Sequence, residues 1–169
     1  RLRLRPPATV VQEVQDLLEQ GVSWLHLCDS EFNLPLEHAK EVCRALIEKG
    51  LGDRVGWYCY CSPVPFDKEL ARLMKSAGCA GINFGVDSLC DEQLLRLGRL
   101  HSSGDVQQLV RLLHGEGINY IFDLLVGAPG ETAETVRMTI ERVRELNVPL
   151  AGIAAGVRVY PGTPLGRAV

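Results

Sequence analysis

The sequence predicts an α/β fold in which about five parallel strands with flanking helices form a barrel or a partial barrel. Short apolar runs that begin near residues 23, 55, 81, 119 and 153 alternate with stretches of helical periodicity. Their starts lie about 26 to 38 residues apart, which is the size of one strand–helix unit. Such units give a parallel sheet with right-handed crossovers, and an open doubly wound sheet is the alternative.

Length and composition are those of one ordinary globular domain. The chain has 169 residues, enough for one sizeable core, so we expect a single domain over residues 1–169. It is 46% hydrophobic and 23% charged, with a formal net charge of −3 and a pI near 5.8. The only clustered positive charge, Arg1 to Arg5, is short and lacks aromatic residues. Neither nucleic acid nor a membrane surface is therefore an expected partner.

Cysteine usage bears on the compartment. The six cysteines have scattered spacings that do not form the disulfide framework of a small secreted protein. No segment reaches the length of a membrane span, and no signal peptide opens the sequence. We therefore expect a cytoplasmic protein.

The expected elements follow one another in regular alternation, with glycines or prolines between them. Apolar strand-like runs are Ser23–Cys28, Val55–Cys61, Gly81–Val86, Tyr120–Val126 and Ile153–Tyr160. Helical spacing is found over Val10–Leu18, Ala39–Ile47, Leu70–Ala77, Asp91–Leu97, Val106–Leu113 and Val136–Leu146. Pro7 suits the first turn of the first helix, Asp67 is a predicted N-cap, and Pro149 forbids continuation of the last long helix.

The stretch from Asn119 to Thr132 predicts a buried strand, a glycine loop and the start of a helix. Its continuous apolar run is typical of a strand buried on both faces, as in a parallel sheet. Gly127 and Gly130 then allow a backbone to approach a ligand closely, and Thr132 is placed to cap the next helix. A polar loop at the carboxyl end of a buried strand is where α/β proteins bind small molecules.

Polar or turn-forming residues follow each predicted strand. Because the carboxyl ends of parallel strands meet on one face, these residues are expected to line one cleft. The alternative is that they merely cap the next helix. They are Asp29, Glu31, Asn33, Ser62, Asp87, Ser88, Gly127 to Thr132, Tyr160 and Thr163.

Other candidates have a structural interpretation beside the functional one. Asp123 lies inside an apolar strand, so it either faces the cleft or bonds a neighbouring Arg or backbone group, and the structural role is slightly favoured. Cys59 and Cys61 point to one face of their strand, where two small core residues are favoured over a metal pair. His26 is expected in the core, whereas three histidines on or beside helices are expected to be solvated: His38, His101 and His114.

Four stretches, in order, resemble the motifs of the radical S-adenosylmethionine (SAM) superfamily. Asp29-Ser-Glu-Phe-Asn33 is similar to the acidic motif after that family's second strand. Gly85-Val-Asp-Ser88 resembles the Gly-x-Glu-Ser stretch after the fourth strand, with Asp in place of the usual Glu. Phe122 to Thr132 resembles the fifth-strand motif, and Tyr160-Pro-Gly-Thr-Pro-Leu165 the segment after the sixth strand. The resemblance covers nearly the whole chain.

This resemblance implies a fold and a chemistry. The fold is a partial (β/α)6 TIM-like barrel of the radical SAM type. In that family a four-iron four-sulfur cluster reductively cleaves SAM, and the resulting 5′-deoxyadenosyl radical abstracts hydrogen from a substrate. The implied substrate is a small molecule or a peptide, and the implied electron donor is a protein such as flavodoxin or ferredoxin.

By position, the resemblance also implies a set of SAM-binding residues. The acidic motif would place backbone near the SAM amino group, and the residues after the fourth strand would face its ribose or carboxylate. The fifth-strand motif would pack on the adenine, and the residues after the sixth strand would add backbone contacts. The implied cofactor-binding residues are Asp29, Ser30, Glu31, Asn33, Asp87, Ser88, Leu125, Gly127, Val157 and Tyr160.

The family's cluster motif, Cys-x-x-x-Cys-x-x-Cys, is not found in the sequence. None of the six cysteines replaces it by spacing, so no metal ligand is assigned to this chain. The motif's place in the family is after the first strand, which would lie upstream of Arg1. We therefore expect a truncated core that holds strands two to six, with an unpaired edge at Ser23 to Cys28. Alone, it is expected to be inactive and to bind SAM poorly, because the iron that chelates the methionine end is missing.

Three further interpretations remain open at this stage. The sequence also resembles family members that carry an upstream cobalamin domain, although nothing within these residues identifies cobalamin. A barrel enzyme of ordinary polar chemistry would bind a phosphate at Gly127 to Thr132, but the nearest expected cation is Arg137, one turn further on. A degenerate, cluster-free barrel would serve as a scaffold or partner-binding module.

Overall fold

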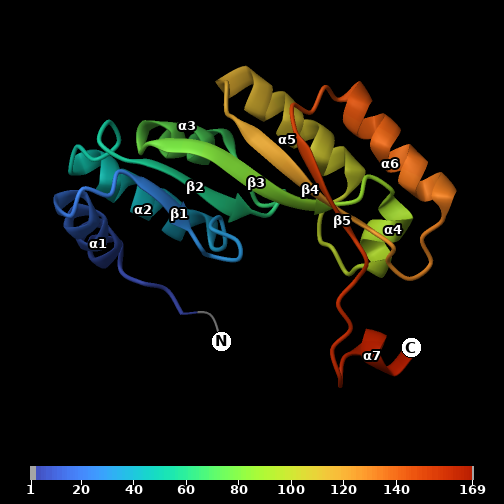
Figure 1. Ribbon diagram of the computed structural model, residues 1–169. Helices are drawn as coiled ribbons and strands as arrows, with labels where there is room; N and C mark the ends of the chain where they lie inside the picture. Colours follow the sequence, from blue (N-terminus) through green and yellow to red (C-terminus); the bar gives the residue numbers. More distant parts are fainter. Residues whose placement is uncertain (1–2, 169) are drawn as a thin grey trace.

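The computed structural model describes residues 3–168, which form a five-stranded parallel sheet with flanking helices (Figure 1). The strands are β1 (Trp24–Leu27), β2 (Gly56–Cys61), β3 (Cys79–Asp87), β4 (Tyr120–Val126) and β5 (Ala151–Ala155). Their order in the sheet is β1-β2-β3-β4-β5, and each neighbouring pair is parallel. The predicted α/β class and the parallel sheet are confirmed.

The strand order distinguishes a barrel-like sheet from a doubly wound one. A doubly wound sheet reverses its strand order at a switch point, whereas this order runs in one direction throughout. Right-handed crossovers then place successive helices on one side of the sheet. Figure 1 shows α3, α5 and α6 along the upper side and α1 and α2 at the β1 end. The alternative of a doubly wound sheet is therefore wrong.

The helices begin and end where the sequence signals them. Their bounds are α1 (Pro7–Glu19), α2 (Leu36–Glu48), α3 (Lys68–Ser76), α4 (Asp91–Arg96), α5 (Ser103–Glu116), α6 (Ala133–Glu145) and α7 (Pro164–Ala168). The Asp67 side chain accepts from the backbone N–H of Leu70, and Thr132 forms a reciprocal capping box with Thr135. The predicted N-caps of α3 and α6 are confirmed.

One face of the sheet packs against the helices and carries the core. Every second residue of the three central strands is buried there: Trp57, Cys59, Cys61, Ile82, Phe84, Val86, Tyr120, Phe122 and Leu124. The intervening residues are exposed or half-buried, so the other face is open. This corrects the expectation that Tyr120–Val126 is buried on both faces. Buried residues alternate with half-buried ones along the strand, so only one of its faces lies in the core.

The last strand also differs from the expectation. The sequence indicated Ile153 to Tyr160, but β5 begins at Ala151 and ends at Ala155. Gly156 follows with φ of +96°, and its N–H donates to the Val126 carbonyl at 2.6 Å. A left-handed glycine turns the chain out of the strand direction, so the residues after it leave the sheet.

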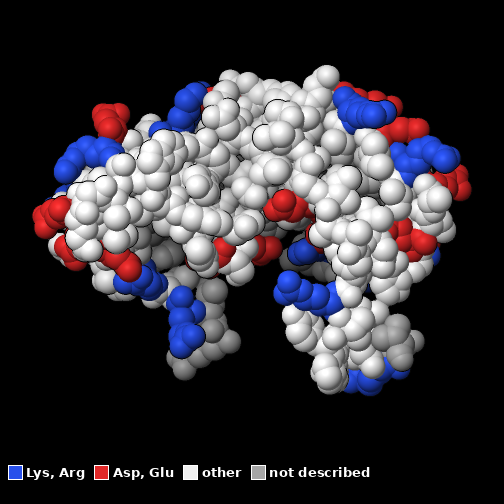
Figure 2. All heavy atoms as spheres, in the orientation of Figure 1, with Lys and Arg blue, Asp and Glu red and all other residues white. Residues whose placement is uncertain are grey.

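Charged side chains lie mainly around the rim of the molecule. Figure 2 shows charges of both signs at its two ends and along its lower edge, with a largely uncharged surface between them.

One buried charge joins two helices. In α2, the buried Lys40 ammonium contacts Asp67 at 2.7 Å and Glu69 at 2.8 Å, and these ion pairs connect α2 to α3. Within residues 3–168, no helix combines the length and the hydropathy of a transmembrane span.

Candidate functional site

The carboxyl ends of the strands lie along one edge of the sheet, as parallel pairing requires. Cys28, Asp29 and Ser30 follow β1 and are exposed, and Glu31 is half-buried. The backbone N–H of Phe32 donates to the Tyr60 carbonyl at 2.8 Å, so this segment crosses from β1 to the end of β2. The acidic motif is therefore held at the sheet edge with its first residues open to solvent.

Asn33 does not face this cleft. Its side chain is fully buried, and its Nδ2 donates to the carbonyls of Ser62 at 2.9 Å and Pro65 at 2.6 Å. Its Oδ1 accepts from the Ser62 backbone N–H at 2.9 Å. An amide with a donor and an acceptor group can satisfy a loop's backbone in this way. Asn33 therefore fixes the loop after β2, and its contact with a cofactor stays a prediction.

Asp87 and Ser88 are neighbours with different orientations. Asp87 ends β3 with φ of +59°, next to a register shift between Gly85 and Asp87, and its carboxylate pairs with Arg99. Ser88 is buried, and its Oγ lies 3.1 Å from Oγ1 of Thr139 in α6. The side chain of Ser88 therefore packs against α6, and its contact with a ligand stays a prediction. The role of Asp87 stays a prediction.

The loop after β4 has the backbone shape that the sequence indicated. Gly127 has φ of +92° and Gly130 has φ of +76°. The Glu131 carboxylate accepts from the Gly127 N–H and closes the loop on itself. Leu125, half-buried, lies on the open face just before the loop. A turn of this kind presents backbone groups that no side chain covers.

Arginines from α4 and the segment after it reach these loops. Arg96 donates to the Gly130 carbonyl and pairs with Glu92 at 2.6 Å, and Arg99 pairs with Asp87. A cation therefore does lie at the glycine loop, which corrects the expectation that Arg137 is the nearest one. The Arg96 guanidinium already bonds the Gly130 carbonyl and the Glu92 carboxylate, so this contact gives little support to a phosphate site at the loop. This contact could not be expected from the sequence, because Arg96 in α4 lies 34 residues before Gly130.

Val157 and Tyr160 lie beyond the end of β5, although the sequence placed them in the last strand. Val157 is half-buried and Tyr160 is exposed, both in non-strand backbone. Thr163 Oγ1 donates to the Tyr160 carbonyl at 2.7 Å and begins a turn into α7. Gly156, the residue before Val157, donates to the Val126 carbonyl and so lies at the end of β4. The contacts of Val157 and Tyr160 with a cofactor stay a prediction.

Two histidines occupy the opposite environments from those expected. His26 is exposed, with its ring centroid 5.2 Å from that of Tyr58 and 5.1 Å from that of Tyr60. His101 is buried, and its Nε2 lies 3.1 Å from the Val86 carbonyl. Burial lowers the pKa of His101. The open sheet face explains the first difference, and the tight turn between α4 and α5 explains the second.

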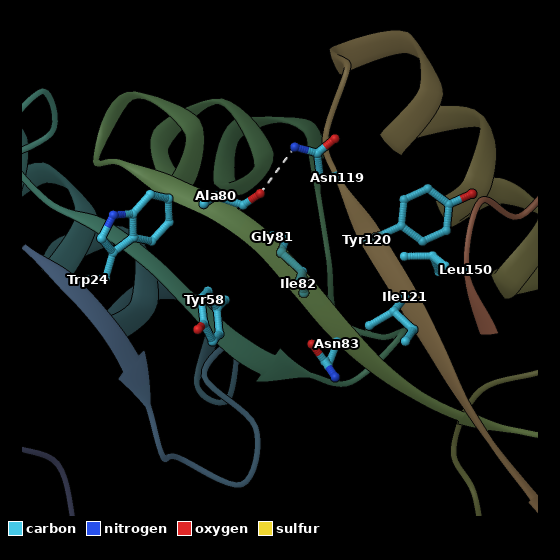
Figure 3. A pocket seen from close by; sticks show the side chains of 10 residues that line it. All are labelled: Trp24, Tyr58, Ala80, Gly81, Ile82, Asn83, Asn119, Tyr120, Ile121 and Leu150. Atoms are coloured by element: carbon cyan, nitrogen blue, oxygen red, sulfur yellow. Dashed lines mark hydrogen bonds between the residues drawn. The ribbon is translucent and has the colours of Figure 1, made fainter. Parts of the chain in front are cut away.

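The open face carries residues that the sequence did not single out. A cavity of about 420 Å³ lies at the amino-terminal half of this face (Figure 3). It is lined by Trp24, Tyr58, Ala80, Gly81, Ile82, Asn83, Asn119, Tyr120, Ile121 and Leu150. Asp123 faces the same side, and Asn83 Nδ2 donates to it at 3.5 Å. The alternation along β2 that places Cys59 and Cys61 on the core face also places Tyr58 and Tyr60 on the open face, and this could have been predicted from the sequence.

The cysteines do not offer a metal centre. Among the described residues no group of three His, Cys, Asp or Glu side chains is placed to hold a metal ion. Cys59 and Cys61 lie in the core with their sulfurs 3.8 Å apart. Hydrogen bonding with the thiols of Cys61 and Cys79, together with burial, raises the pKa of Cys59. The residues that the structure describes therefore do not fit an iron–sulfur cluster.

The fold and the strand-end loops define a class of protein, and comparison with known families identifies it. The profile described as "Radical SAM superfamily" matches residues 1–143. The chain therefore belongs to the radical SAM superfamily. It is similar to tryptophan 2-C-methyltransferase of Streptomyces laurentii, with 36% identity over 95% of this chain and 29% of that protein. It is also 29% identical to the anaerobic magnesium-protoporphyrin IX monomethyl ester cyclase of Cereibacter sphaeroides, over 96% of this chain and 27% of that protein.

Solved structures support the same assignment. The methyltransferase TsrM from Kitasatospora setae, solved with cobalamin and a [4Fe-4S] cluster, superposes with a TM-score of 0.87. It shares 37% identity over 96% of this chain and 31% of the other. The cobalamin-dependent radical enzyme OxsB has a TM-score of 0.71 at 17% identity, a likeness of fold alone. The chain spans about three tenths of the length of these relatives, so the activity of a complete protein is a matter for proposal.

Proposed function

We propose that this chain is the SAM-binding core of a radical SAM enzyme that reductively cleaves S-adenosylmethionine. The observation that carries the proposal is the family match over residues 1–143 together with five strand ends on one sheet edge. The exposed start of the acidic motif, Asp87 and the Gly127 loop there offer carboxylates, backbone and an apolar wall. A zwitterionic ligand that carries adenine needs these groups.

Within the proposal, residues 1–169 act as one domain holding the second to sixth strands of the barrel. The iron–sulfur cluster, which supplies the electron, would be held by cysteines outside this chain, because none of the described residues fits it. The electron donor would be a small redox protein such as flavodoxin or ferredoxin. All six cysteines are free thiols, which favours a reducing compartment and thus the cytoplasm.

One relative favours a second, finer function. Tryptophan 2-C-methyltransferase shares 36% identity with this chain, and a TsrM structure at 37% identity holds cobalamin. We infer a cobalamin-dependent methyl transfer to a small molecule as the finer function. The scaffold alternative draws no support from these relatives, whose names describe enzymes.

The products of SAM distinguish the two functions. The complete protein, reconstituted anaerobically with iron and sulfide, is incubated with SAM and a chemical reductant, with and without cobalamin. Radical cleavage releases 5′-deoxyadenosine, whereas methyl transfer releases S-adenosylhomocysteine. 5′-Deoxyadenosine formed only by the cluster-loaded protein supports reductive cleavage, and S-adenosylhomocysteine formed only when cobalamin is present supports the methyl transfer. A protein that holds a cluster and SAM but forms neither product contradicts the proposal.

A further inference from the structure

One fully buried side chain in α4 has an amide without a partner. Gln93 is 1% exposed, and among the residues that the structure describes neither its Nε2 nor its Oε1 has a hydrogen-bond partner. A buried amide that is left unpaired costs free energy, because it has given up water and gained no bond in return. Almost all buried polar groups in folded proteins are paired, so this exception calls for an explanation. The observed position of α4 is therefore destabilised by its own glutamine.

Other buried polar side chains around α4 are paired. Ser88 Oγ lies 3.1 Å from Oγ1 of Thr139, and Ser103 Oγ donates to the Asp91 carboxylate at 3.0 Å. Hydrogen bonds have narrow ranges of distance and angle, so they hold the segment in one discrete position. A shift of α4 would exchange one set of partners for another. Gln93 is the member of this group that gains from such an exchange.

The outer side of α4 and of the turn after it is apolar. Leu95 is 79% exposed and Leu100 is 95% exposed, and Gly98 between them has φ of +69°. Exposed leucines contribute little packing to hold the segment in place. With an unpaired amide inside and uncovered leucines outside, this segment belongs to the part of the molecule that opens at low cost.

Residues 91–100, which we call the α4 strap, contact the strand-end loops. Arg96 donates to the Gly130 carbonyl, and Arg99 pairs with Asp87 at the end of β3. Figure 1 shows α4 beside the loop that leads from β4 to α6. The strap therefore touches the loops at which SAM is proposed to bind, so a ligand there and the position of the strap influence each other.

We propose that Gln93 is a positioning residue of the SAM site: SAM binding shifts the α4 strap, and the shift gives the Gln93 amide a hydrogen-bond partner. The inference rests on the proposed function, because the ligand is the SAM of that site. The unpaired amide disfavours the ligand-free position of the strap and so raises the population of the position that binds SAM. When a binding-competent state is only partly populated, the apparent affinity falls with its population. Removing the amide should therefore weaken SAM binding without the loss of any contact with SAM.

Gln93→Met is the test variant, because methionine has nearly the shape of glutamine and carries no amide. It is made in the complete, cluster-loaded protein, and SAM binding is measured by calorimetry without oxygen. The variant should melt at a higher temperature than wild type and bind SAM at least about fivefold more weakly. A purely structural role would move both quantities in the same direction, since damage to the fold lowers stability and affinity together.

Ser103→Ala is the matched control. Ser103 is also buried, but its hydroxyl is paired with Asp91. The control should melt at a lower temperature and bind SAM as wild type does. A Gln93→Met protein that melts below wild type would show that the amide is already paired, for example with an internal water, and overturns the inference. Unchanged SAM affinity in Gln93→Met overturns it as well. Should Gln93→Met fail to fold, Gln93→Leu repeats the test.

Hydrogen exchange with and without SAM follows the strap directly. In wild type, SAM should change the exchange rate of residues 91–100 at least about fivefold, with α2 as the internal reference. A wild-type protein that binds SAM without such a change refutes this inference and leaves the proposed function standing. A wild-type protein that holds its cluster and binds no SAM refutes the proposed function and the inference with it.

Discussion

At the scale of single residues, the site depends on how β3 ends. The register shift between Gly85 and Asp87, together with the left-handed backbone of Asp87, turns the Asp87 carboxylate toward Arg99 and sends Ser88 into α6. Asp and Asn tolerate a left-handed backbone better than most residues other than glycine. The geometry therefore restricts position 87 to very few residue types.

Substitutions at Asp87 and Ser88 should have different effects, the first on SAM affinity and the second on stability. In the complete protein, Asp87→Asn keeps the backbone conformation but removes the charge, and we expect SAM affinity to fall about tenfold. Ser88→Ala should leave SAM affinity unchanged and lower the free energy of unfolding by about 1 kcal/mol, through the lost contacts with Thr139 and the Cys90 N–H. The measurements are SAM calorimetry and denaturant unfolding. A loss of SAM affinity in Ser88→Ala alone contradicts these assignments.

His101 should make stability depend on pH. Burial, aided by the nearby Arg99 charge, lowers its pKa below the ordinary 6.5, although the hydrogen bond with the Val86 carbonyl and the charges of Asp87 and Asp105 oppose the shift. The unfolded state then binds the proton more readily, so stability is complete above pH 6.5 and falls as the pH drops through the lowered pKa. Thermal unfolding between about pH 5 and pH 8 should show this decline, and His101→Gln should flatten it. An equal slope in both proteins argues against His101 as the cause.

At the scale of elements, glycines govern how helices lead into strands. Gly78 joins α3 to β3 with φ of +92°, and a Cβ there would clash with the carbonyl oxygens of Val55 and Gly52. Backbone atoms cannot swing aside as a long side chain can. The α3–β3 connection therefore depends on this glycine.

Gly78→Ala should lower the free energy of unfolding by more than about 2 kcal/mol, since left-handed strain adds to the clash. Gly115→Ala in α5 is the matched control, because a Cβ there meets nothing within 4 Å. That control should stabilise the helix by about 0.5–1 kcal/mol. Chemical unfolding of the two variants measures both effects. A Gly78→Ala protein as stable as wild type would show that this connection relaxes freely.

The elements could be predicted from local signals, but the directions of several side chains could not. Alternation, caps and terminal glycines predict the order of strands and helices because they act within a few residues. Asn33 bonds a loop 29 residues away, and His101 bonds the Val86 carbonyl on another element. Ser88 turned inward because a bulge changed the alternation at the last residue of β3. Such outcomes depend on tertiary packing that sequence spacing does not encode.

At the scale of the whole molecule, the sheet is open at an edge. Within the described residues β1 pairs only with β2, as the sequence predicted for this edge. A second hollow of about 450 Å³ lies beside β1 and α1, lined in part by Leu25, Leu27 and Val14. The β1 side of the strand-end loops is therefore open within the described residues.

The most direct test is calorimetric titration of SAM, without oxygen, into the complete cluster-loaded protein and into the isolated 169-residue chain. We predict specific binding by the complete protein and binding at least about tenfold weaker by the isolated chain, because the iron that chelates the methionine end is absent from the latter. No binding by the complete protein would contradict the assignment of the strand-end loops to SAM. Equally tight binding by both would contradict the dependence on a cluster held outside these residues.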